Sequence, residues 1–186
     1  VPGYIVGPYG YGKTSTAGKV WYTLEKENNY IATPPIYFKD LQAIIDAVYG
    51  WMRYRLSGRE DYLEKLEESY EAKATNNVDD LISQTDLENK DDVKNELEHL
   101  IESGTIDIEF SVNSVLEFLS ECNQIARDAG FDGLVVIADE LQQFVSNHSS
   151  DKEAYSELRD IAKSIALGLN EGDGLGLLFT MDDGLH

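Results

Sequence analysis

Apolar residues along this chain follow two patterns, which are short uninterrupted runs and longer segments with apolar positions three or four residues apart. Short runs favour buried strands, and the longer spacing favours amphipathic helices. Strands are predicted at residues 4–6, 30–33, 106–110, 134–138 and 175–180, and helices around residues 17–24, 41–52, 63–70, 93–101, 112–126 and 151–169. Strands that alternate with helices predict an α/β fold with a mostly parallel central sheet.

Turn-forming residues separate these segments. Pro34 and Pro35 end the second predicted strand, because proline cannot donate to a strand ladder. Asp40 is placed to cap the helix that follows. Loops are predicted at residues 75–80, around Gly130 and at residues 172–174. The 186 residues are enough for one domain with a buried core.

The strand at residues 4–6 runs directly into a glycine-rich loop that fits the phosphate-binding pattern G-x-x-x-x-G-K-[ST]. Glycines let backbone N–H groups close around phosphates, and the following helix adds its positive N-terminal dipole. Lys13 would reach the β- and γ-phosphates, and the Thr14 hydroxyl would ligate Mg²⁺. The residues predicted to bind a nucleoside triphosphate are Gly7, Pro8, Tyr9, Gly10, Tyr11, Gly12, Lys13, Thr14 and Ser15.

The apolar run at residues 134–138 ends in two acids, Asp139 and Glu140. A continuous apolar run is typical of a strand buried on both faces, and open α/β sheets bind ligands at the carboxyl ends of such strands. Asp139 is predicted to hold Mg²⁺ with Thr14, as a Walker B aspartate does. Glu140 is predicted to polarise the water that attacks the γ-phosphate. The other interpretation is that two acids begin a helix after a core strand.

The chain is strongly acidic, with 35 acidic and 15 basic residues and a net charge of −20. This charge repels nucleic acid phosphates, and it also fits a protein adapted to high salt. The single cysteine, Cys122, excludes an internal disulfide and is predicted to be buried on an apolar helix face. With no signal peptide and no stretch of 18 apolar residues, a cytoplasmic protein without a membrane span is expected.

Residues 60–102 carry fifteen acids and four bases, a net charge of −11. We interpret them as an acidic helical insertion on the nucleotide-binding core, either a solvated appendage or a contact for a partner. Arg53, Arg55 and Arg59 precede this segment, and a solvated helix end explains them better than a DNA contact does. The spacing of His99, His148 and His186 fits no metal site. Because the chain starts at Val1 and ends soon after its last strand, residues 1–186 are expected to be the core of a larger protein.

The two motifs together resemble those of AAA+ and STAND ATPases, in the P-loop division with a catalytic glutamate after the Walker B aspartate. The glycine-rich loop and the sequence GLVVIADELQQF at residues 133–144 are also similar to large prokaryotic ATPases of BREX-type phage-defence systems. The resemblance implies a P-loop NTPase fold, which is a three-layer α/β/α sandwich. It implies a central P-loop strand beside a "sensor" strand, with the Walker B strand next. Thr180, or secondarily Asp182, is the expected catalytic sensor residue.

The resemblance also implies ATP and Mg²⁺ as ligands, and a helical lid with an arginine finger from a neighbouring subunit or partner. Arg159 is a weak match to such a finger. One functional hypothesis is hydrolysis of ATP that drives conformational change in a DNA-associated or phage-defence assembly, with DNA bound outside this chain. A second is a nucleotide-gated switch with slow or no turnover. A third, phosphotransfer, is disfavoured because Glu140 is present and no acceptor-binding motif is visible.

Overall fold

The computed structural model describes residues 3–83, 112–140 and 174–182. Every strand pair among these residues is parallel, which confirms the predicted α/β fold with a mostly parallel sheet. The described elements are β1 (Gly3–Gly7), α1 (Lys13–Lys26), β2 (Tyr30–Ala32), β3 (Ile36–Tyr37), α2 (Leu41–Arg55), α3 (Glu60–Ser83), α5 (Val112–Asp128), β4 (Gly133–Asp139) and β5 (Gly176–Asp182).

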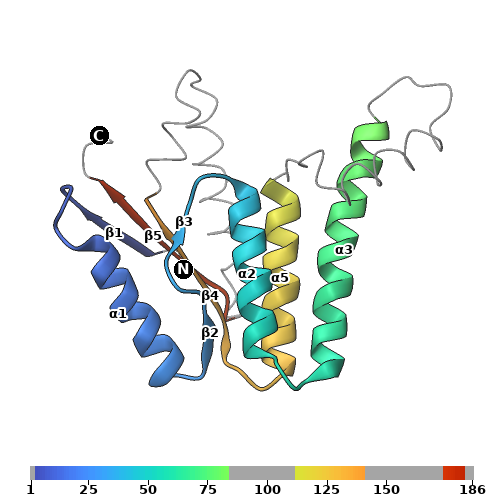
Figure 1. Cartoon of the computed structure of the whole chain (residues 1–186), viewed down its shortest axis with the longest axis horizontal. Helices are drawn as coiled ribbons and strands as arrows, with labels where there is room; N and C mark the ends of the chain where they lie inside the picture. Colours follow the sequence, from blue (N-terminus) through green and yellow to red (C-terminus); the bar gives the residue numbers. More distant parts are fainter. Residues whose placement is uncertain (1–2, 84–111, 141–173, 183–186) are drawn as a thin grey trace.

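The strands lie in the order β1-β5-β4-β2, and β3 also pairs with β4. The strand that leads into the glycine-rich loop is therefore next to the expected sensor strand, and the Walker B strand follows, as the resemblance implied. The expectation of a central β1 is not met within the described residues, because β1 pairs there with β5 alone and is the outermost strand. Parallel pairing brings the carboxyl ends of β1, β5 and β4 to one end of the sheet (Figure 1).

Helices flank the strands on two sides. Figure 1 shows α1 on one side of the strands and α2, α5 and α3 on the other. The largest fully buried side chains include Phe38, Phe118 and Phe179, which belong to the core between the strands and α2 and α5. Asn123 of α5 is also buried, and its side-chain oxygen accepts a hydrogen bond from Leu134 N at 2.9 Å. The core and this bond fix α5 against β4, the strand that ends at Asp139.

The second predicted strand ends before the proline pair, as β2. Thr33 leaves the strand, but its backbone N–H still donates to Val135 O at 2.9 Å, and its side-chain oxygen accepts from Ile137 N at 2.9 Å. The threonine hydroxyl thus takes the place of a backbone acceptor beside Pro34 and Pro35. The chain then returns to the sheet as β3, a two-residue strand that the hydrophobic pattern did not predict.

Two predictions about the helices have opposite outcomes. The cap at Asp40 is confirmed, because its carboxylate accepts a hydrogen bond from Ala43 N at 2.7 Å. The loop predicted at residues 75–80 is wrong, because α3 continues as one helix to Ser83. Asn and Asp have weak helix propensity, and such local preferences are readily overridden by their surroundings.

The first part of the acidic segment packs onto the rest of the protein. Leu66 of α3 is fully buried in the core. Lys73 is also buried, and its ammonium group binds Glu117 of α5 at 3.0 Å and Glu121 at 2.9 Å. Burial alone would lower the pKa of Lys73, but the hydrogen bonds to the two glutamates outweigh it and raise the pKa above its usual value. At least this stretch is more than a solvated appendage.

Several predictions concern residues outside the described ranges. They are the helices at 93–101 and 151–169, the strand at 106–110, Arg159 and the three histidines. Cys122, in contrast, is buried in α5 as predicted, and burial raises the pKa of its thiol well above the usual value. In the part of the chain that the structure describes, no helix is long and apolar enough to cross a bilayer.

Candidate functional site

The loop between β1 and α1 depends on two glycines with left-handed backbone conformations. Gly10 has φ 83° and Gly12 has φ 77°, values that residues with a Cβ atom rarely adopt. Tyr11 N donates to Pro8 O at 3.3 Å, which closes a turn inside the loop. Gly12 then acts as the N-cap of α1 without a side-chain hydrogen bond. The loop therefore turns back on itself and leads directly into the N-terminus of α1. The N-terminus is the end of a helix that attracts anions.

Lys13 and Thr14 leave this loop in the first turn of α1. The Lys13 ammonium group donates to the carbonyl oxygens of Gly7 at 2.9 Å and Pro8 at 3.0 Å. These bonds hold the Lys13 ammonium group against the start of the loop. Tyr9 and Tyr11 point outward, with 86% and 79% of their surface exposed. Ser15, the last predicted nucleotide-binding residue, is exposed in the same helical turn.

The predicted Walker A and Walker B residues meet in space. The Thr14 hydroxyl donates a hydrogen bond to Asp139 Oδ2 at 2.8 Å, although 125 positions separate the two residues. The Thr180 hydroxyl donates to the other oxygen, Asp139 Oδ1. Asp139 is 8% exposed and Thr180 is fully buried. The sheet therefore places one buried carboxylate between hydroxyl groups from two different elements.

Glu140 follows at the end of β4 with an unusual backbone. Its φ is 59°, and it is the one described residue other than glycine with a positive φ. Its N–H donates to the Thr180 hydroxyl oxygen at 3.0 Å. The preceding carbonyl, Asp139 O, accepts from Phe38 N at 3.0 Å. The carbonyl and the N–H of the peptide group between Asp139 and Glu140 are thus both hydrogen-bonded, one to the residue after β3 and the other to β5.

The chemistry of these groups suits Mg²⁺ bound with a phosphate. Magnesium prefers oxygen ligands and is usually held by one or two carboxylates or hydroxyls together with substrate phosphates and water. Thr14 and Asp139 supply such a pair beside the helix N-terminus. Within the described ranges no three His, Cys, Asp or Glu side chains gather closely enough to hold a metal by themselves. A magnesium ion bound by these side chains would accordingly take its other oxygen ligands from the phosphates and from water.

The structure changes the interpretation of two predicted features. Thr180 is not the last residue of its strand, because β5 continues to Asp182, whose backbone lies in register with Gly7. Arg55 is not a solvated helix end, because it forms an ion pair with Glu25 of α1. Burial, with a smaller contribution from Arg59, lowers the pKa of Arg55. Long side chains after a helix can equally be drawn into contact with another element, and the sequence pattern does not distinguish the two cases.

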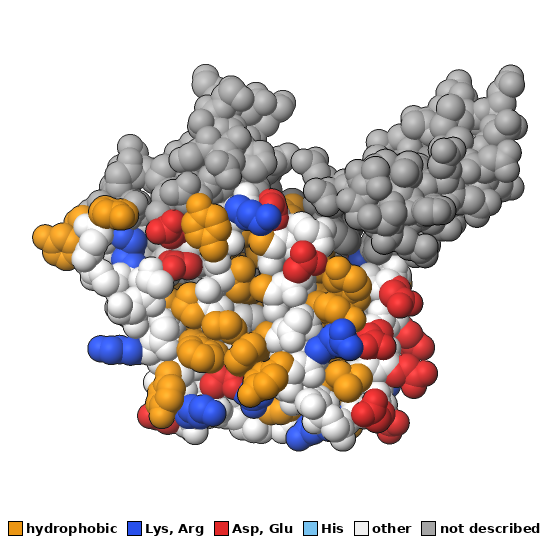
Figure 2. All heavy atoms as spheres, in the orientation of Figure 1, with side chains coloured by type: hydrophobic (Ala, Val, Ile, Leu, Met, Phe, Trp, Pro, Cys, Tyr) orange, Lys and Arg blue, Asp and Glu red, His pale blue; other side chains and the backbone are white. Residues whose placement is uncertain are grey.

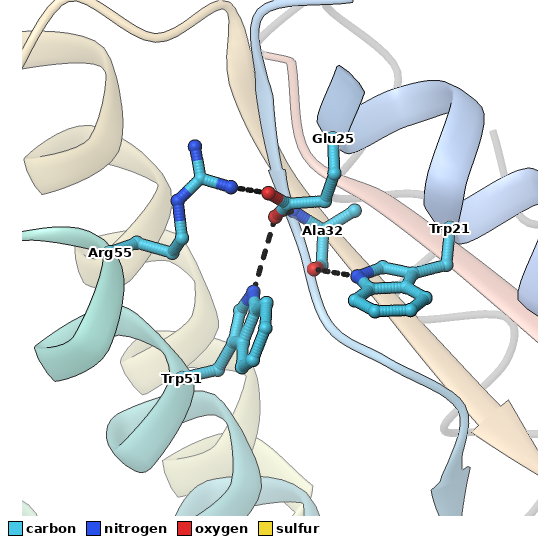
Figure 3. A network of polar contacts seen from close by, with 5 residues as sticks. All are labelled: Trp21, Glu25, Ala32, Trp51 and Arg55. Carbon is cyan, nitrogen blue, oxygen red and sulfur yellow. Dashed lines mark hydrogen bonds and ion pairs between the residues drawn. The ribbon is translucent and has the colours of Figure 1, made fainter. Parts of the chain in front are cut away.

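This ion pair belongs to a second polar network, at the edge strand β2 (Figure 3). The Glu25 carboxylate also accepts from Trp51 Nε1 at 3.1 Å and from Ala32 N at 2.8 Å. Trp21 Nε1 donates to Ala32 O at 3.0 Å, and the rings of Trp21 and Trp51 meet edge to face at 5.8 Å. The network joins α1, β2 and α2, and sequence reasoning had found none of its contacts.

Surface charge is unevenly distributed. Figure 2 shows acidic side chains gathered along α3, on the opposite side of the view from β1. Asp61, Glu64, Glu68 and Glu71 of this helix are exposed. The glycine-rich loop and the candidate site therefore lie away from the acidic surface of α3.

Comparison with known proteins adds one finding. Neither the curated proteins nor the solved structures gave a match. The model of one protein family, described as "BREX system ATP-binding protein BrxC/D", matches residues 55–181. That range includes Asp139, Glu140 and Thr180, and it starts after the glycine-rich loop. Because the match spans more than half of the 186 residues, this chain belongs to the BrxC/BrxD family of BREX system ATP-binding proteins.

Proposed function

We propose that this chain binds ATP with Mg²⁺ and hydrolyses it, and that hydrolysis drives conformational change in a larger DNA-associated or phage-defence assembly. The observation that carries the proposal is the hydrogen bond from Thr14 to Asp139, because it joins the glycine-rich loop to the acidic strand end at 2.8 Å. Membership of a family described as ATP-binding supports the choice of ligand. The proposal includes a P-loop NTPase fold with a three-layer α/β/α arrangement.

Each residue of the site has a distinct part in this proposal. The backbone of residues 7–12 and the N-terminus of α1 receive the phosphates, and Lys13 neutralises charge on the β- and γ-phosphates. Thr14 and Asp139 would hold Mg²⁺, which when bound offsets charge that develops on the phosphate oxygens. Glu140 orients and polarises the attacking water. Thr180, on the neighbouring strand, contributes to catalysis through its hydrogen bond to Asp139.

Other parts of the assembly would complete the activity. In related P-loop enzymes an arginine finger contributes about 10³- to 10⁵-fold in rate. We propose that a second copy or a partner subunit supplies this finger, and that DNA binds through regions outside this chain. The net charge of −20 supports the second point, because a surface of this sign repels nucleic acid.

A nucleotide-gated switch is the second candidate function. The description of the family names ATP binding and does not name hydrolysis. In a switch, bound ATP would stabilise one conformation of the assembly and turnover would be slow or absent. The two functions use the same loop and Asp139, and they differ in the role of Glu140.

Turnover of ATP by the full chain and its Glu140→Gln variant separates these functions. We expect the variant to bind ATP normally and to lose about 10²- to 10⁴-fold in turnover, because glutamine cannot accept a proton from water. Glu64→Gln is the matched control, because Glu64 is exposed on α3. The assay is run with and without DNA, at low and molar salt. Equal turnover by both forms would contradict the catalytic assignment, and tight binding without turnover in every condition would favour the switch.

A Lys13→Ala variant tests the binding site itself. The ammonium group would face two phosphates, so its removal is expected to weaken ATP binding by about 100-fold or more. Lys19→Ala, on the exposed part of the same helix, is the control. Binding is measured by titration calorimetry in the presence of Mg²⁺. Unchanged affinity in Lys13→Ala would contradict the proposed phosphate site.

A further inference from the structure

The peptide group between Asp139 and Glu140 is held by both strands that flank the end of β4. Its carbonyl oxygen accepts from Phe38 N at 3.0 Å, directly after β3. Its N–H donates to the Thr180 hydroxyl oxygen at 3.0 Å, from β5. β3 and β5 both pair with β4. The plane of this peptide is therefore fixed from two directions, and the Glu140 side chain leaves the strand at the angle that φ sets relative to this plane.

The Thr180 hydroxyl has little capacity left for other contacts. A hydroxyl group has one proton to donate and two lone pairs to accept with. Here the proton is directed to Asp139 Oδ1, and one lone pair receives the N–H of Glu140. Thr180 is also fully buried. Its geometry is that of a group that connects the two acids, rather than one that reaches a phosphate.

The backbone of Glu140 requires such support. A φ of 59° is uncommon for a residue with a side chain, and such conformations persist where the surroundings impose them. The hydrogen bond from Glu140 N to Thr180 holds the peptide plane on one side of the N–Cα bond, the bond about which φ is the rotation. Without the hydroxyl acceptor, the bond from Phe38 N would be the one described contact left on this peptide, so the Glu140 backbone could relax toward an ordinary strand conformation and shift its carboxylate.

We propose that Thr180 is a positioning residue, which holds Glu140 in its left-handed conformation and so aims the catalytic carboxylate, and that it is not a sensor of the γ-phosphate. This inference rests on the proposed hydrolysis of ATP. In this inference Thr180 does not contact the nucleotide, and it acts through its hydrogen bond to the Glu140 backbone. It also explains why a threonine lies inside β5 and not at the strand's end.

Thr180→Val and Thr180→Ser in the full chain test the proposal. Valine keeps the shape and removes the hydroxyl, so kcat is expected to fall about 10- to 100-fold because the carboxylate is misplaced. KM and the ratio of ATP to ADP affinity are expected to stay unchanged, since Thr180 does not contact the phosphates. Serine retains the hydroxyl and is expected to keep most of the wild-type kcat. A valine variant with an altered ATP to ADP affinity ratio would support a sensor and overturn the proposal, as would one with unchanged kcat.

A double-mutant cycle shows whether Thr180 acts through Glu140. If it does, Thr180→Val added to Glu140→Gln causes no further loss of turnover, because the misplaced carboxylate is already gone. Losses that multiply would overturn the proposal while leaving the hydrolytic function intact. Normal turnover in Glu140→Gln, or none in the unmodified chain, would overturn the hydrolytic function and this inference with it. If Thr180→Val does not fold, Thr180→Ala is used in both experiments with the same expectations.

Discussion

Two carboxylates, Asp139 and Glu25, are largely buried in this protein and are surrounded very differently. Glu25 receives a guanidinium group and two N–H donors, from Arg55, Trp51 and the backbone of Ala32. The donors that the structure shows at Asp139 are two uncharged hydroxyls, from Thr14 and Thr180. Glu25 has its counter-charge in Arg55, whereas the hydrogen bonds described at Asp139 come from neutral hydroxyl groups beside the glycine-rich loop.

The difference separates an acid that is paired inside the fold from one that is available to the proposed metal. A buried charge is costly unless it is paired, so Glu25 and Arg55 stabilise the junction of α1 and α2 only as long as both are present. Hydroxyl donors orient Asp139 without adding a positive charge, so in the proposed function a cation that arrives with a nucleotide would add a favourable interaction. The sequence predicted Asp139 as a magnesium ligand and gave no signal for Glu25, whose partners only the structure shows.

The largest expected effect on folding is at Arg55. Arg55→Leu leaves Glu25 buried without its counter-charge, and the free energy of unfolding is expected to fall by about 3 kcal/mol. Arg53→Leu is the control on the same helix, since its 3.5 Å pair with Glu67 is about half exposed and is worth less than about 1 kcal/mol. Urea denaturation measures both. Equal losses in the two variants would remove the distinction between a buried and an exposed pair.

Asp139→Asn is expected to change stability little and to weaken ATP binding, which is the opposite of the pattern expected for Arg55→Leu. It removes a buried charge whose described hydrogen bonds come from two neutral hydroxyls, so the free energy of unfolding should change by less than about 1 kcal/mol. ATP affinity in Mg²⁺ should fall at least about tenfold, because the metal loses an anionic ligand or a ligand of its bound water. Without Mg²⁺ the two proteins should bind ATP similarly. A loss of several kcal/mol in urea would instead make Asp139 a structural acid like Glu25.

Trp51→Phe refines the comparison on a smaller scale. It keeps the ring and removes one N–H donor to the Glu25 carboxylate, so a loss of about 1–2 kcal/mol in unfolding free energy is expected. Trp21→Phe removes a donor to a neutral carbonyl and is expected to cost less. ATP turnover should be unaffected in both. A larger loss in Trp21→Phe would show that the charge of Glu25 is not what the tryptophan stabilises.

The residues of the candidate site were found from the sequence because each belongs to a short local pattern. The spacing of glycines with Lys13 and Thr14 reflects backbone requirements inside one loop, and Asp139 with Glu140 follows one apolar run. Parallel strands place their carboxyl ends together, so the meeting of these two motifs was also predictable. The structure adds which atoms touch: Thr14 with one oxygen of Asp139, and Thr180 with the other.

The network around Glu25 carried no such signal. Its members lie on two helices and an edge strand, and amphipathic spacing shows only that some of them face inward. The short strand β3 was missed for a related reason, because two residues after a proline pair form no hydrophobic pattern. The bond from Thr33 to Ile137 that bridges this gap involves residues 104 positions apart. Contacts of this range depend on how the elements pack.

The sequence by itself determined the α/β class, the ligand class and the identity of the acids at the strand end, because those depend on local backbone geometry and on short-range spacing. The tertiary structure decided how the acids are held. It gave Glu25 a buried counter-charge, left Asp139 with uncharged donors, and set Glu140 in a left-handed conformation on the hydroxyl of Thr180. The charge and hydrogen-bond partners of a buried group come from segments far away in the chain, and only packing brings those segments together.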